Sequence, residues 1–356
     1  MNRVLLRSSL LLLSTSLIAV SASAGQADQR LDIYWIDVEG GAATLIVTPA
    51  GESVLIDAGS PGGGAPGQPG RDAGRILEVA RNVAGLSQID SLVVTHFHLD
   101  HFGGVAEVSR GIPVGTIYEN PLDEVAPQER AQPALSDYVQ AAAKRRRIIE
   151  AGLEIPLAGK MGSAYPKLRF VGTRRKFVPL GSTRANAEIC AAATRKADDP
   201  SDNAMSAVLL LRFGAFRFFV GGDITWNVEE TLACPQDLVG SVDVYQSTHH
   251  GLDQSNNPVL LKTLKPSVVV FTNGARKGLG SVTVAAVRAL PSLKGVFQLH
   301  QGLAEEAANA EPAHIANASE ACAGAYIKLS VDPEGKSYVV TLPSTKHKQS
   351  FDVRKR

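Results

Sequence analysis

The sequence predicts a mixed fold of helices and strands in one large domain. Short apolar segments with the composition of β-strands recur along the chain, and segments with a helical period lie between them. The 356 residues contain no repeat of solenoid length and no linker that would divide them. We therefore expect one α+β domain over residues 25–356, with an insertion around 119–200.

The expected elements follow from the apolar runs and from the turns that separate them. Strands are predicted over residues 31–38, 43–47, 53–56, 89–95, 207–212, 216–220, 242–247, 267–271, 325–331 and 337–342. Helices are predicted over residues 71–84, 136–151 and 258–264. The rest of the insertion is polar, and we expect it to be irregular.

The first 24 residues have the pattern of a cleavable secretory signal. Arg3 and Arg7 precede an apolar run from Leu10 to Val20, and Ala22-Ser23-Ala24 offers small residues for cleavage. The run is too short for a stable membrane span, although a retained anchor is the alternative. No later segment is long and apolar enough to cross a bilayer. We therefore expect a periplasmic or secreted protein that starts near Gly25.

Charge and cysteine content restrict the class of protein. Without the leader, 34 Lys and Arg face 35 Asp and Glu, so the net charge is about −1. A nucleic-acid substrate stays open but has no support from this charge. The three cysteines allow at most one disulfide and form no C-x-x-C zinc motif. The oligomeric state is left open.

The strongest chemical signal is the segment THFHLDHFGG, Thr95 to Gly104. On extended backbone His96, His98 and Asp100 point the same way, and a turn at Asp100 would bring His101 back toward them. Imidazole and carboxylate ligands together suit zinc or a similar first-row metal. A surface histidine cluster is the alternative, but the position after an apolar strand favours a metal site.

Three further strand ends carry side chains that can bind a metal. They are Asp57 in SVLIDAG, Asp223 in RFFVGGDI and the His249-His250 pair in VDVYQSTHHG. Each alone would ordinarily be a cap or turn residue. Together with the histidine segment they predict a metal centre built from several strand ends.

This set of residues resembles the metallo-β-lactamase superfamily, whose most specific motif here is H-x-H-x-D-H. The resemblance extends from about Leu31 to Leu342 and implies a four-layer αββα sandwich with a metal pair at one edge. Within the superfamily, DVEGGAATLIVTPAGESVLIDAG, SDNAMSAVLLLRFGAFRFFVGGDI and STHHG resemble the soluble metal-binding domain of bacterial competence (DNA-uptake) proteins. They are also similar to its stand-alone secreted relatives.

The resemblance implies two zinc ions, with manganese or iron as alternatives. The implied ligands are His96, His98, Asp100, His101, Asp223 and His249. His96 and His98 would bind one ion, Asp100, His101 and His249 the other, and Asp223 would bridge them. His250 would then face the substrate or the leaving group, and Asp57 would orient a ligand histidine.

One ligand of the family pattern is missing. Superfamily members with two ions generally have a further histidine between the histidine motif and the bridging aspartate, but this chain has none between His101 and His249. The segment SDNAMS takes its place and offers Asp202, Asn203 and Ser206. We therefore expect the His96/His98 site to bind its ion more weakly.

The implied reaction is hydrolysis by a metal-bound hydroxide, with Asp100 as a proton acceptor. No Ser-His-Asp or Cys-His arrangement is evident by spacing. A phosphoester or phosphodiester is the favoured substrate, and Lys277, with Arg276 beside it, offers a phosphate contact at the rim. A lactone, ester or β-lactam hydrolase of the same fold and a non-catalytic metal-binding module are the alternatives.

Overall fold

The computed structural model describes residues 24–26, 28–62, 64, 68–157, 164–181, 183–305 and 307–356. The expected leader lies almost wholly outside these ranges, so its cleavage stays a prediction. Among the described residues, no helix combines the length and the apolar character needed to cross a membrane.

The first sheet has the strand order β20-β19-β18-β1-β2-β3-β4-β5-β6. Its strands are β1 (Leu31–Trp35), β2 (Thr44–Val47), β3 (Ser53–Ile56), β4 (Ile89–Val93), β5 (Val114–Glu119), β6 (Arg146–Ile148), β18 (Ile327–Val331), β19 (Ser337–Leu342) and β20 (His347–Asp352).

The second sheet has the order β17-β16-β15-β14-β12-β11-β8-β7, and β9 pairs with β8. Its strands are β7 (Glu154–Ile155), β8 (Pro166–Thr173), β9 (Lys176–Phe177), β11 (Val208–Phe213), β12 (Phe216–Val220), β14 (Val244–Gln246), β15 (Val268–Phe271), β16 (Gly295–His300) and β17 (Ile315–Asn317). A small separate ladder joins β10 (Arg184–Ala185) to β13 (Gln236–Asp237).

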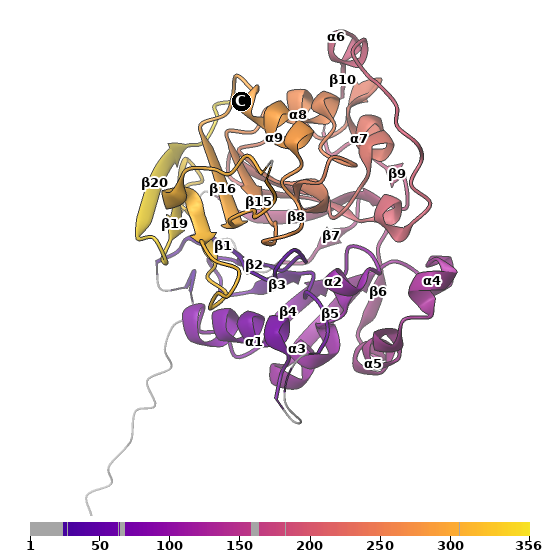
Figure 1. The fold of residues 1–356 in the computed structure, drawn as a ribbon, viewed down its shortest axis with the longest axis vertical. Helices are drawn as coiled ribbons and strands as arrows, with labels where there is room; N and C mark the ends of the chain where they lie inside the picture. The colour runs from indigo at the N-terminus through magenta and orange to yellow at the C-terminus, as the bar shows by residue number, and fades with distance from the viewer. Residues whose placement is uncertain are drawn as a thin grey trace, which may run out of the picture.

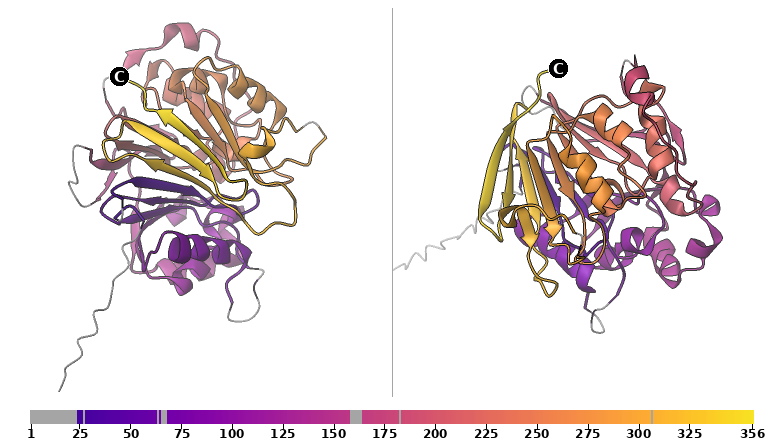
Figure 2. Two further views of the ribbon diagram at one scale, coloured as in Figure 1. Left: turned by 90° about the vertical axis from the view of Figure 1, so that its left-hand side faces the viewer. Right: turned by 45° about the horizontal axis from the view of Figure 1, so that its top comes forward.

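Helices cover the outer faces of both sheets, as Figures 1 and 2 show. The first sheet is covered by α1 (Arg71–Glu78), which continues as a π-helical turn, and by α2 (Leu99–Phe102), α3 (Val105–Gly111) and α5 (Pro133–Ala142). The second is covered by α7 (Trp226–Ala233), α8 (Pro258–Leu264) and α9 (Ser281–Arg288). The expected four-layer αββα sandwich is thus confirmed.

Alternation along the strands explains why the two sheets pack. In β1, Leu31, Ile33 and Trp35 lie in the core between the sheets, whereas Tyr34 faces the core under the helices. Successive strand side chains point to opposite faces, so a strand with both faces buried is apolar throughout. Four of the five residues of β1 are apolar or aromatic, the exception being Asp32. All five are buried.

The insertion was predicted least well. The expected helix over 136–151 is wrong, because α5 begins at Pro133 and ends at Ala142, and Arg146–Ile148 forms the edge strand β6. Proline at a first helical position explains the early start. The segment also contains β8, an eight-residue strand whose pairing with β11 the sequence did not reveal. Two short helices, α4 (Pro127–Arg130) and α6 (Ala187–Cys190), lie there as well.

A disulfide joins two helical segments beside the second sheet. Cys190 at the end of α6 is bonded to Cys234, which follows α7. Cys322 remains a free thiol. This uses the single bridge that three cysteines allow.

Strand directions bring several loops to one edge of the sandwich. β1, β3 and β4 run the same way, because β2 is antiparallel to both β1 and β3, and β4 is parallel to β3. In the second sheet β12, β14, β15 and β16 are mutually parallel. The carboxyl ends of these strands carry the residues considered next.

Candidate metal centre

Seven side chains from three strand ends converge at this edge, and we call them the histidine cluster. Its members are His96, His98, Asp100, His101, Asp223, His249 and His250. The first four follow β4, Asp223 follows β12, and the last two follow β14. Two subsets have ligand atoms close enough to share one ion: His96, His101 and Asp223, and Asp100, His101 and His250.

The carboxylate of Asp223 lies close to four imidazoles of the cluster. Its Oδ2 lies 3.2 Å from Nε2 of both His101 and His250. The same oxygen is 3.8 Å from Nε2 of His249 and 4.0 Å from Nε2 of His96. Asp223 therefore lies at the centre of the cluster.

Asp100 supplies the second carboxylate of the cluster. Its Oδ2 lies 3.4 Å from His250 Nε2 and 3.7 Å from His101 Nε2. Lys277 donates to the same oxygen from the rim, at 2.5 Å. The loop after β1 also packs here, because Ala42 N–H donates to the Asp100 carbonyl and a Cβ on Gly41 would lie 2.5 Å from that carbonyl oxygen.

Hydrogen bonds behind the cluster orient two of its imidazoles. Asp57 faces Nδ1 of His101 at 2.8 Å, and it also accepts from the backbone N–H and hydroxyl of Thr95 at 2.8 Å each. His250 Nδ1 lies 3.3 Å from the Thr272 carbonyl. Such contacts direct Nε2 of each ring toward the carboxylates, as they do for metal-bound histidines. Thr95 was missed in the sequence, although it directly precedes His96.

The backbone at the histidine pair is strained. His249 and His250 have φ values of 49° and 55°, in the left-handed region that non-glycine residues seldom adopt. The buried Glu229 carboxylate holds the flanking chain, since it accepts from the Thr248 hydroxyl and from Asn256 N–H and Asn257 N–H. Burial raises the pKa of Glu229 to about 7.

The electrostatics of the cluster favour a bound cation. Burial disfavours charge on all of these groups, yet Asp223, Asp57 and Asp100 hold the pKa of His101 well above its usual value. The histidines in turn hold the pKa values of Asp100 and Asp223 well below theirs. His96 is different, because burial and the charge of His101 lower its pKa.

His96 supplies the test of whether a metal fits. Its Nε2 is buried beside Asp223 and finds no hydrogen-bond partner in the described part of the chain. A buried polar atom without a partner costs about 1–3 kcal/mol. A divalent cation beside Asp223 would satisfy this nitrogen. The Nε2 atoms of His101 and His250, 3.3 Å apart, likewise have the spacing of two ligands that share a cation. The residues present therefore fit a metal ion.

The order of the histidine pair differs from our expectation. His250, with its side chain 1% exposed, joins Asp100 and His101, whereas His249 is 12% exposed and contacts Asp223 only at 3.8 Å. Ser255 Oγ lies 3.3 Å from Nδ1 of His249. Both residues have left-handed backbone, and in this conformation the imidazole of His250 lies deeper in the cluster than that of His249.

The His96/His98 side of the cluster contains an acid that the sequence did not suggest. His98 Nε2 lies 3.3 Å from Oε1 of Glu129, on α4 of the insertion. Glu129 is buried, and its Oε2 has no hydrogen-bond partner among the residues that the structure describes. No motif marks this residue, because it reaches the site only through the path of the insertion.

Two of the three polar candidates in SDNAMS accept hydrogen bonds from the backbone. Asp202 accepts from Phe97 N–H at 2.6 Å, and Ser206 accepts from Asp223 N–H at 3.1 Å. Asn203 is buried, and within the described ranges its Oδ1 has no partner. The first two therefore support the backbone of the site, and Asn203 keeps a free oxygen.

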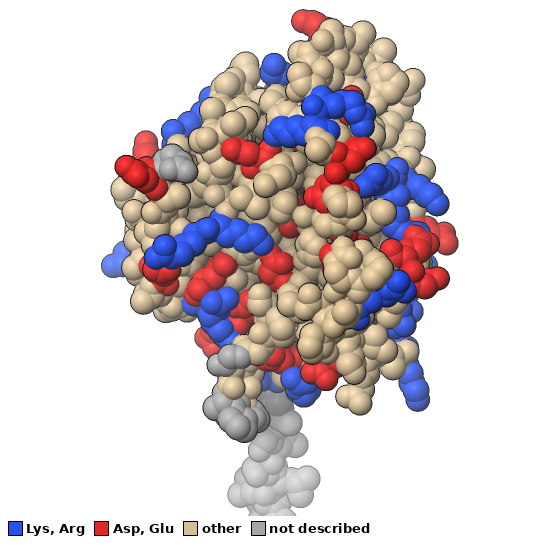
Figure 3. Space-filling model, turned by 45° about the vertical axis from the view of Figure 1, so that its right-hand side comes forward, with Lys and Arg blue, Asp and Glu red and all other residues tan. Residues whose placement is uncertain are grey.

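The surroundings of the cluster carry both signs of charge. Arg276 is highly exposed and pairs with Glu320, so it differs from its neighbour Lys277, which reaches Asp100. On the face drawn in Figure 3, acidic and basic side chains are interspersed. That face offers no broad basic area of the kind expected for a nucleic-acid track.

Known proteins resemble this chain only distantly in sequence. No curated protein matches the sequence. Among solved structures, CmlA, a diiron beta-hydroxylase from Streptomyces venezuelae, is 15% identical with a TM-score of 0.42, over 76% of this chain and 52% of that one. This chain thus spans about half the length of that enzyme.

Two further structures are similar over most of their own length. A putative metal-dependent hydrolase from Parabacteroides distasonis is 12% identical with a TM-score of 0.39, over 75% of this chain and 92% of that one. A diphosphatase from the PhnP family is 15% identical with a TM-score of 0.37, over 76% and 96%.

The family model described as the metallo-beta-lactamase superfamily matches residues 36–163. The matched residues include His96, His98, Asp100 and His101, together with Asp57 behind them. Residues 36–163 therefore match the metallo-beta-lactamase superfamily.

Proposed function

We propose that the protein is a metal-dependent hydrolase that binds two zinc ions in the histidine cluster. The observation that carries this proposal is the convergence of four imidazoles, those of His96, His101, His249 and His250, on Asp223 Oδ2. Asp100 adds a second carboxylate beside two of these imidazoles. His96 and His98 would hold one ion with Glu129 or Asn203 nearby. Asp100, His101 and His250 would hold the other, and Asp223 would contact both.

Two such ions supply a water molecule of lowered pKa and Lewis acids that stabilise developing negative charge. The protein supplies orientation and proton transfer. Asp57 and the Thr272 carbonyl fix the rings of His101 and His250, and Asp100 Oδ2 accepts a proton from the attacking water. His249, the more exposed of the pair, is left to face the substrate or the leaving group.

We propose a phosphoester or phosphodiester as the substrate. Lys277 supports this substrate class, because its ammonium lies at the rim of the cluster, 2.5 Å from Asp100 Oδ2. Once Asp100 binds a cation, this ammonium becomes available to a phosphate oxygen. Membership of the competence-type branch stays a prediction from the sequence.

Replacement of Lys277 by Met tests the substrate class. We expect kcat/KM for a generic phosphodiester to fall about tenfold or more, whereas lactone and β-lactam turnover should change little. Lys262→Met, an exposed lysine of α8, is the matched control. Turnover of a lactone or β-lactam in preference to the phosphodiester would favour the alternative hydrolase, and no turnover of any of them by the zinc-loaded protein would favour a binding module.

We also propose that the protein is exported and cleaved near Gly25. The Cys190–Cys234 disulfide supports this, because such bonds persist in oxidising compartments. The intact mass of the exported protein should lack the leader. Recovery of the chain from the membrane fraction with Met1 retained would contradict the proposal.

A further inference from the structure

A second group of metal-binding side chains lies at the same edge of the sandwich, and we call it the Cys322 cluster. It consists of Asp37, Glu39, Arg75, His300 and Cys322. Asp37 and Glu39 follow β1, His300 ends β16, and Cys322 lies in the loop before β18. Ligand atoms of all its members except Arg75 lie within 4.8 Å of one another.

Three of these atoms form a small triangle. Asp37 Oδ2 lies 2.9 Å from His300 Nε2 and 3.3 Å from Cys322 Sγ. The remaining side, from Cys322 Sγ to His300 Nε2, is 3.5 Å. Ligand atoms of a tetrahedral zinc ion, given its bond lengths, lie roughly 3.3–3.6 Å apart. The triangle therefore has nearly the dimensions of one face of such a site.

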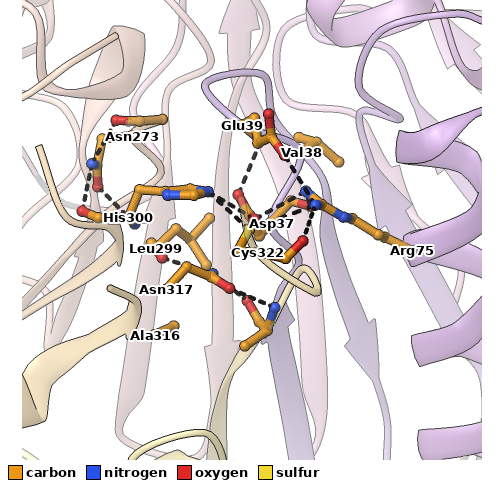
Figure 4. A network of polar contacts seen from close by, with 12 residues as sticks. Asp37, Val38, Glu39, Arg75, Asn273, Leu299, His300, Ala316, Asn317 and Cys322 are labelled. Carbon is orange, nitrogen blue, oxygen red and sulfur yellow. Dashed lines mark hydrogen bonds and ion pairs between the residues drawn. The ribbon is translucent and has the colours of Figure 1, made fainter. Parts of the chain in front are cut away.

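The side chains of the Cys322 cluster differ in solvent exposure. Asp37 and His300 are fully buried, whereas Glu39 and Cys322 are partly exposed. Figure 4 shows the His300 ring and the Arg75 side chain approaching Asp37 from opposite sides. An ion could thus enter past Glu39 and Cys322 and meet the buried pair.

The cluster also has more acidic groups than basic ones, which favours binding of a cation. Arg75 contacts Asp37 Oδ2 at 3.0 Å and Glu39 Oε1 at 2.9 Å, so one guanidinium faces two carboxylates. Arg71 reaches Glu39 but pairs with Asp72 as well. A divalent ion that displaces the thiol proton of Cys322 to solvent would bring Asp37, Glu39, Arg75 and Cys322 to net neutrality.

A nucleophilic role for Cys322 fits less well. His300 presents the same nitrogen, Nε2, to both Asp37 and Cys322, so it lacks the relay in which a base accepts from the thiol at one nitrogen and is held at the other. Burial and the Asp37 carboxylate also raise the pKa of the thiol. Both features argue against Cys322 as a nucleophile.

We propose that Asp37, His300 and Cys322 form a separate binding site for a thiolate-preferring divalent metal such as zinc, with Glu39 or water as the fourth ligand. The site does not depend on the proposed hydrolase function. An ion there would fix the loop after β1, whose Gly41 and Ala42 lie against Asp100.

Cobalt is a selective probe for this site. Of the three cysteines in the sequence, two are joined in a disulfide, so Cys322 is the single thiol that can bind a metal. We expect Co²⁺ added to the metal-free full chain, without reductant, to give a near-ultraviolet thiolate-to-cobalt charge-transfer band. The histidine cluster has no sulfur ligand and cannot produce it. A thiol assay on the unfolded, non-reduced protein should find one thiol per chain.

Variants assign the band to its site. Cys322→Ser should abolish it and lower the bound cobalt by one ion per chain, whereas Asp223→Asn, in the histidine cluster, should retain it. If Cys322→Ser does not fold, the wild-type protein still gives an answer, because Zn²⁺ should slow the reaction of Cys322 with a thiol reagent at least tenfold. Absence of the band at saturating Co²⁺, or an unchanged thiol reaction with Zn²⁺, would overturn the proposal.

Discussion

The histidine cluster and the Cys322 cluster lie at the same edge of the sandwich, on different strands of each sheet. The histidine cluster draws on β4 of the first sheet, with Asp57 after β3 behind it, and on β12 and β14 of the second sheet. The Cys322 cluster draws on β1 and β16. β1 is two places from β3, and β16 is two places from β14. In both clusters, loops at the carboxyl ends of strands from the two sheets bring acidic side chains and imidazoles together.

The two clusters differ in how their charges are satisfied. In the histidine cluster the one lysine, Lys277, reaches in from the rim, and His101 and His250 have partners for Nδ1. In the Cys322 cluster Arg75 contacts the acids directly, and His300 Nδ1 has no partner among the described residues. An arginine can take the place of a metal ion beside buried carboxylates. We therefore expect strong binding in the first cluster and weaker, competed binding in the second.

The largest effect should follow from loss of Asp100. Asp100→Ala removes an expected ligand and the proton acceptor, so hydrolysis should fall by at least about 10–100-fold, the usual cost of a lost partner at a metal site. Rates are compared at saturating zinc with those of Asp123→Ala, an exposed acid outside the cluster. Circular dichroism should show that the fold persists. Unchanged turnover would contradict the proposed mechanism.

A smaller effect should separate the two ions of the histidine cluster. Because the family's further histidine is missing, we expect zinc titration of the metal-free protein to show one tight ion and one weaker ion. Glu129→Gln should weaken the second ion about tenfold, since the acid lies beside His98.

Glu124→Gln, an exposed acid that pairs with Arg174, is the control for this titration. Activity should follow the filling of the weaker site if both ions act in catalysis. Two ions of equal affinity would show that the His96/His98 site lacks no ligand, and full activity with one ion bound would show that the second ion is not needed for catalysis. An unchanged titration in Glu129→Gln would show that this acid does not support the weaker ion.

The third prediction concerns competition by Arg75. Arg75→Gln removes the fixed charge beside Asp37, so cobalt affinity at the Cys322 cluster should rise about tenfold, or ~1.4 kcal/mol. Arg71→Gln should have less effect, because Arg71 reaches only Glu39 within the cluster. The measured quantity is the midpoint of the thiolate–cobalt band. Unchanged affinity in Arg75→Gln would show that the arginine does not compete with the metal.

Local patterns in the sequence were enough to predict most strands around the site, whereas the layers of the fold were expected from the resemblance to the metallo-β-lactamase superfamily. Alternating and continuous apolar runs marked β1 to β4, β11, β12 and the antiparallel pair of β18 and β19, but not the last strand, β20. The turn residues between them indicated where the strands end. The H-x-H-x-D-H spacing predicted a common face for its side chains because direction along an extended chain depends on neighbouring residues alone.

Contacts between distant segments were decided only by the tertiary structure. Glu129 reaches His98 through a helix of the insertion, and Cys322 meets Asp37 and His300 because β18 lies beside β1 while β16 ends at the same edge. Whether His249 or His250 turns inward depends on two left-handed φ values in the loop after β14. Sheet order and backbone torsions set these positions, and both result from packing the whole chain, which no short pattern of residues contains.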